Sequence, residues 1–134
     1  VVGGGLQVYG VGPGTTNIRA SFQTFSIRPT IINVESCTLS TIVVTPNQHN
    51  FSATGQTRQF TATGNYISST GGSTASCPST VNLTNSAVWT SQNNNIFTVN
   101  DEGGNKGLAT AGNTVGSAEI RASLSGITGF STIN

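Results

Sequence analysis

The chain has 134 residues, of which only 7% are charged, and its formal net charge is +1 at pH 7. This balance gives no electrostatic reason to bind nucleic acid or an anionic membrane surface. No apolar run reaches the roughly 20 residues of a membrane-spanning helix, so we expect no membrane insertion. Disorder is also disfavoured, because disordered chains combine high net charge with few β-branched residues, whereas Val, Ile and Thr are abundant here. These properties predict a folded β protein with an uncharged polar surface.

An internal repeat indicates how the chain is organised. Residues 5–22 and 107–124 align without a gap at an offset of 102 residues, with 8 of 18 positions identical. An offset of about 100 residues is the size of one small β-sandwich domain, and such a repeat is typical of modular proteins. We therefore predict that residues 1–35 are the C-terminal strands of a preceding or neighbouring module. Residues 36–134 would then form one complete domain.

In chain order, the first part predicts three short strands, near 6–9, 15–22 and 25–32. Alternation along the second strand places its apolar residues on one face, and three strands without a facing sheet are not stable alone. This face therefore needs cover from another module. A short, semi-rigid linker is expected at 31–37, which lacks Gly and Pro. The predicted inter-module contacts are Leu6, Ile18, Ala20, Phe22 and Ile31.

The second part predicts seven strands at intervals typical of an antiparallel sandwich. The first of them ends at Pro46, which cannot donate a hydrogen bond within a sheet. The fold class is therefore predicted to be all-β, an immunoglobulin-like antiparallel β-sandwich of about seven strands, with Phe60, Trp89, Val99 and Ile120 in its core. The strands are expected at 39–45, 56–63, 87–91, 96–100, 107–111, 117–124 and 129–133.

Two cysteines, Cys37 and Cys77, are present. An even count without CxxC or His-rich spacing favours a disulfide, which belongs to an oxidising compartment. Two separate buried thiols are the alternative. Cys77 lies in the irregular segment 64–86, which we interpret either as a solvated loop held by the disulfide or as a contact loop for a neighbouring module or ligand.

Residues able to perform catalysis are few. Asp101 and Glu102 are adjacent, so within a strand they would face opposite ways and could not form a glycosidase pair. A weak Ca²⁺ site in their turn is the alternative. His49 is the sole histidine, and its turn-rich surroundings predict an exposed, inert side chain. We expect no catalytic residue, no cofactor and no metal site, and hence no enzyme.

Five motifs follow one another in a fixed order: Ile42-Val-Val-Thr-Pro46, Gly55-x-x-x-Gln59-Phe-Thr-Ala62, Val88-Trp-Thr-Ser91, Ile96-Phe-Thr-Val99, and Gly107-Leu-x-Thr-Ala111 followed by Gly116-x-Ala-x-Ile-x-Ala122. Together they resemble the group 2 bacterial immunoglobulin-like domains, over Leu39 to Ile133. The resemblance implies a β-sandwich that occurs as tandem modules in bacterial surface proteins, adhesins and appendages of secreted enzymes, without family-wide catalytic residues. Segment 64–86 departs from the family pattern, so the resemblance implies no role for the cysteine pair.

Two functional hypotheses follow. The first is a structural module of an extracellular or cell-surface bacterial filament or adhesin. It would be joined to neighbouring immunoglobulin-like modules or identical subunits, either covalently in tandem or by strand complementation. The second is a carbohydrate-binding accessory module of a secreted protein, in which Tyr9, Tyr66 and Phe130 could form an exposed aromatic platform for surface glycans.

Overall fold

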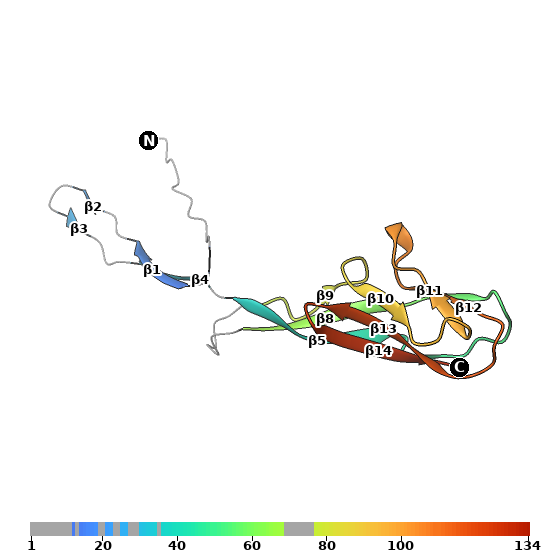
Figure 1. Cartoon of the computed structure of the whole chain (residues 1–134). Coiled ribbons are helices and arrows are strands. Elements are labelled where there is room, and N and C mark those ends of the chain that lie inside the picture. Colours follow the sequence, from blue (N-terminus) through green and yellow to red (C-terminus); the bar gives the residue numbers. More distant parts are fainter. Residues whose placement is uncertain are drawn as a thin grey trace. The chain divides into compact units, whose positions relative to one another are not determined.

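A computed structural model of the chain describes residues 12, 14–18, 21–22, 25–26, 30–34, 36–68 and 77–134 (Figure 1). The chain divides into two compact units, of which the larger comprises residues 38–67 and 77–134. Within the described ranges every regular element is a β-strand except a short 3₁₀ turn, η1 (Gly103–Asn105). None of the described helical structure is long and apolar enough to cross a membrane.

Two three-stranded sheets of the larger unit meet where Phe60 separates two consecutive strands. These strands are β7 (Thr57–Gln59) and β8 (Thr61–Ser68), and the Phe60 N–H donates to the Gly107 carbonyl oxygen at 2.9 Å. β12 lies beside β7 and is followed by β11, whereas β8 lies between β5 and β9. These neighbours are β5 (Cys37–Thr45), β9 (Val81–Asn82), β11 (Phe97–Val99) and β12 (Leu108–Ala111).

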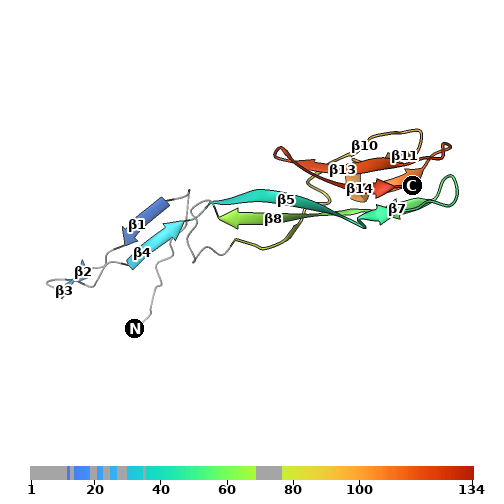
Figure 2. The ribbon, with the colours of Figure 1, turned by 90° about the horizontal axis from the view of Figure 1, so that it is seen from below.

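A four-stranded sheet has the order β10-β13-β14-β6. β10 (Val88–Ser91), β13 (Ala118–Leu124) and β14 (Ile127–Ile133) are antiparallel, and β6 (Gln48–His49) pairs in parallel with the end of β14. β13 and β14 form a layer over β5 and β8 (Figure 2). Antiparallel sheets packed face to face around an apolar interior form a β-sandwich. The predicted all-β sandwich is thereby confirmed.

A two-residue turn joins β13 to β14. Leu124 lies opposite Ile127, and the residues between them, Ser125 and Gly126, have φ angles of 51° and 81°. Positive φ at both central positions is the geometry of a type I′ turn, whose twist matches that of the strands on either side. Gly126 adopts it without strain because it has no Cβ.

The core lies between the facing sheets. Phe60, Phe97, Ile120 and Ile133 are fully buried, and Trp89 is 3% exposed. Burying one such Phe side chain contributes about 1.5–3 kcal/mol. Three of the residues expected in the core, Phe60, Trp89 and Ile120, lie within this cluster, whereas Val99 is half-buried against its edge.

The described part of the smaller unit contains two short antiparallel ladders. β1 (Gly14–Ile18) pairs with β4 (Thr30–Val34), and β2 (Ser21–Phe22) pairs with β3 (Phe25–Ser26). The linker expected at 31–37 is therefore wrong for most of its length. Its first part belongs to β4, and Cys37 already begins β5.

Candidate functional site

The C-terminal residue lies at the end of the sandwich opposite to the one where β5 begins (Figures 1 and 2). β5 is nine residues long, which corresponds to about 30 Å. Ile133, the last residue of β14, pairs with His49 just beyond the far end of β5. Asn134 continues this contact, since its N–H donates to the His49 carbonyl at 3.0 Å and its carbonyl accepts from the Phe51 N–H at 2.9 Å. We call this the C-terminal end of the sandwich.

A pocket of about 210 Å³ opens at the C-terminal end. Phe51, Ile96 and Asn134 line it, together with the loop that contains Val115. Phe51 and Ile96 pack against the core, while Val115 is fully exposed. No local pattern predicts this cluster, because its residues come from three loops and the C-terminal residue, and no spacing in the chain relates them.

The two cysteines form a disulfide, as predicted. Cys37 is the first residue of β5, and Cys77 begins the described stretch after β8. The bond therefore closes a loop of about 40 residues, which restricts the unfolded chain more than it changes the folded one.

The turn that was considered for Ca²⁺ has another role. The Asp101 carboxylate accepts the backbone N–H of Trp89 at 2.8 Å and forms an ion pair with the Lys106 ammonium at 3.2 Å. Lys106 also donates to the Ala87 carbonyl at 3.0 Å. In the part of the chain that the structure describes, no three His, Cys, Asp or Glu side chains lie close enough to hold a metal ion. Asp101 thus connects the start of β10 to the turn after β11.

His49 is half-buried, so the expectation of an exposed side chain is wrong. Its ring stands nearly perpendicular to the rings of Phe51 and Phe60, at centroid distances of 4.8 and 6.3 Å. The parallel pairing of β6 with β14 brings the ring against the core, and no local signal in the sequence predicts this pairing.

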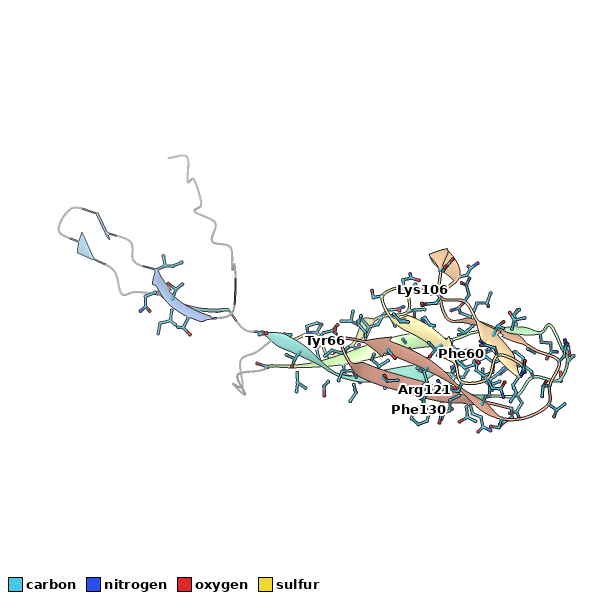
Figure 3. All side chains as sticks on the ribbon, viewed as in Figure 1. Phe60, Tyr66, Lys106, Arg121 and Phe130 are labelled. Carbon is cyan, nitrogen blue, oxygen red and sulfur yellow. The ribbon has the colours of Figure 1, made fainter. Side chains whose placement is uncertain are left out.

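The aromatic residues considered for a glycan platform do not gather at one place among the described residues. Phe130 on β14 is 60% exposed and lies directly opposite Arg121 of β13 (Figure 3). The Arg121 guanidinium is held by Glu119 through Nε and Nη2, at 2.9 and 2.7 Å. Tyr66 is half-buried on β8, and Tyr9 lies outside the described residues.

The predicted inter-module contacts are only partly described. Leu6 and Ala20 lie outside the described residues, and for Phe22 only its place on β2 is described. Ile18 is half-buried and lies opposite Thr30, whereas Ile31 is 62% exposed and lies opposite Asn17. Directly opposed residues share a face and neighbours alternate, so Ile18 and Ile31 belong to opposite faces of the ladder. Ile31 therefore does not belong to the face of the ladder that carries Ile18.

No protein-family model matches the chain, so the resemblance to group 2 bacterial immunoglobulin-like domains stays a prediction. The chain is similar to Ice-binding protein 1 of Shewanella frigidimarina (strain NCIMB 400), with 37% identity over 106 residues. The similarity covers 78% of this chain and 11% of the relative. The chain thus spans only about a tenth of the length of this relative.

Proposed function

We propose that the chain is a non-catalytic structural module of an extracellular bacterial protein, in which it is joined in series to other modules and adds length and stiffness. The observation that carries this proposal is the position of the two ends of the sandwich. β5 begins at one end, and Asn134 is hydrogen-bonded at the other. A domain threaded in this way extends a chain of modules by its own length, whereas a domain with adjacent ends would project from the side.

The similarity to Ice-binding protein 1 supports a modular setting. The match takes in most of this chain but 11% of that protein, which is the relationship expected of one module within a larger assembly. Ice binding is the property for which the relative is named. For the present chain, we propose a supporting role next to whichever part of the parent protein binds its target.

The disulfide supports an extracellular or cell-surface location. Such bonds persist in oxidising environments and are rare in the reducing cytosol. With only 7% charged residues, the surface relies on Thr, Ser and Asn for its solubility. We propose that modules of this kind build a filament or the stalk of an adhesin.

Small-angle X-ray scattering on tandem fusions of the full chain tests the serial arrangement. One, two and three copies should show a maximum dimension that rises by at least about 30 Å per copy, the length of β5. A matched fusion with about 20 Gly/Ser residues between copies should give a broader distance distribution, because such linkers are flexible. A maximum dimension that stays nearly constant from two copies to three would contradict the proposal.

A further inference from the structure

The hairpin in the smaller unit turns at the same place in the repeat as the last hairpin of the sandwich. In the sandwich, Leu124 of β13 lies opposite Ile127 of β14. In the smaller unit, Phe22 of β2 lies opposite Phe25 of β3. The offset of 102 residues relates Phe22 to Leu124 and Phe25 to Ile127. The two copies therefore share the register of their turn as well as their sequence.

The sandwich shows what covers these strands when the domain is complete. Ile120 and Ala122 of β13 are fully buried in the core, and Trp89 of β10 lies directly opposite Ala122. The repeat has the same amino acids at the corresponding positions, Ile18 and Ala20. Ile18 is only half-buried, although its counterpart has no exposed area. Its position in the repeat is therefore one that a facing sheet covers.

We propose that the N-terminal repeat supplies the closing strands of a second immunoglobulin-like sandwich, whose other strands, equivalent to β5–β11, come from another module. This inference names the partner in the serial arrangement proposed above and rests on it. A second copy of the sandwich does not fit this role, because its own β13 and β14 already occupy the place that the hairpin would take.

The register of β1 with β4 differs by one residue from that of β13 with β14. Ile120 lies opposite Ser131 in the sandwich, so exact repetition would place Ile18 opposite Pro29, yet Ile18 lies opposite Thr30. Proline has no N–H to donate to a neighbouring strand. The shift of one residue puts Ile31 on the face opposite to Ile18. Ile18 is therefore the residue to substitute.

A fusion protein can supply the missing strands covalently. Gly5 corresponds to Gly107 in the repeat, so residues 36–106 placed directly before Gly5 recreate the order of a complete module and retain both cysteines. Hydrogen exchange is then measured for the amides of 14–18 and 21–22 in the fusion and in the 134-residue chain. We expect exchange in these strands to be at least about ten-fold slower in the fusion, as for strands that enter a cooperative core.

Two variants of the fusion separate a specific fit from general crowding. Ile18→Ser should abolish the slowing, because it places a hydroxyl in the new core. Asn17→Ser should preserve it, because Asn17 is exposed and corresponds to Glu119 on the outer face of the sandwich.

Unchanged exchange of the hairpin amides in a fusion whose residues 77–134 stay protected would overturn the proposal. Slowing that depends on the concentration of the unfused chain would also overturn it, since a second copy would then be the partner. The scattering test on tandem copies does not depend on hairpin protection, so the two proposals can fail separately.

Discussion

Gly129 lies in the middle of β14, where the backbone of β5 passes close to it. A Cβ added at this position would overlap the carbonyl oxygen and carbon of Ile42, which are backbone atoms and cannot rotate away. The small residue thus permits the close approach of the first strand of the domain to the last one. At single-residue scale, this contact sets how tightly the two sheets close.

Gly129→Ala should therefore destabilise the sandwich by about 1–3 kcal/mol, the usual cost of forcing extra volume into a packed interior. Denaturant unfolding followed by Trp89 fluorescence measures the change. Gly104→Ala is the matched control, because nothing lies within 4 Å of its added Cβ, and it should alter stability by no more than about 0.5 kcal/mol. Equal effects of the two substitutions would show that β5 can move away from β14.

At the scale of elements, the β13–β14 hairpin is the longest pairing whose register is described. It contains seven opposed residue pairs, from Ala118↔Ile133 to Leu124↔Ile127. Its turn holds Ser125 at a φ of 51°, the only positive φ of a non-glycine residue within the described ranges. Left-handed backbone costs an ordinary residue roughly 1–2 kcal/mol, whereas Asn adopts it more readily. Ser125 therefore adopts this turn conformation at a cost in conformational free energy.

Ser125→Asn should raise the free energy of unfolding by about 0.5 kcal/mol, because Asn-Gly is the preferred pair for a type I′ turn. Ser125→Val should lower it by about 1–2 kcal/mol, since a β-branched side chain opposes positive φ. Thermal and denaturant unfolding of both variants provide the comparison. If Asn and Val had the same effect, the turn would not depend on φ at this position.

At the scale of the whole molecule, the disulfide adds to the stability that a small apolar core provides. The charged residues are too few for extensive ion-pair networks, and the two ion pairs found among the described residues, Lys106–Asp101 and Arg121–Glu119, are partly exposed. Such surface pairs contribute little. The disulfide and the apolar core therefore account for most of the stability that the described structure explains.

Replacing both Cys37 and Cys77 by Ser should lower the free energy of unfolding by about 4 kcal/mol in the chain-entropy description of a loop of roughly 40 residues. The parent chain treated with a reducing agent should show the same loss, while the Ser variant should not respond to the reductant. A reductant effect on the Ser variant would mean that the loss has another origin.

Much of this architecture is predictable from local patterns. Alternation of apolar and polar residues locates seven strands of the sandwich, but it misses the two-residue strands β6 and β9. It also ends the second strand at residue 63, whereas β8 extends to Ser68. Pro46 directly follows the end of β5. Trp89 and Phe60 are expected in the core because large apolar side chains in half-buried strands face inward. The two cysteines predict their bond by count alone. Each of these inferences uses information that lies within a few residues or in the composition.

The remaining features depend on contacts between distant segments. Three of them arise where loops from different strands meet at the C-terminal end. They are the half-buried ring of His49, the pocket beside Val115 and the backbone hydrogen bonds of Asn134. The face on which Ile31 lies also depends on pairing, because a shift of one residue in a ladder reverses the side of every later residue. Sequence by itself determined the strands, the disulfide and the repeat, since these follow from local chemistry. Only the tertiary structure decided which strands pair, in which register, and where the chain leaves the domain, because pairing energies depend on partners that the local sequence does not contain.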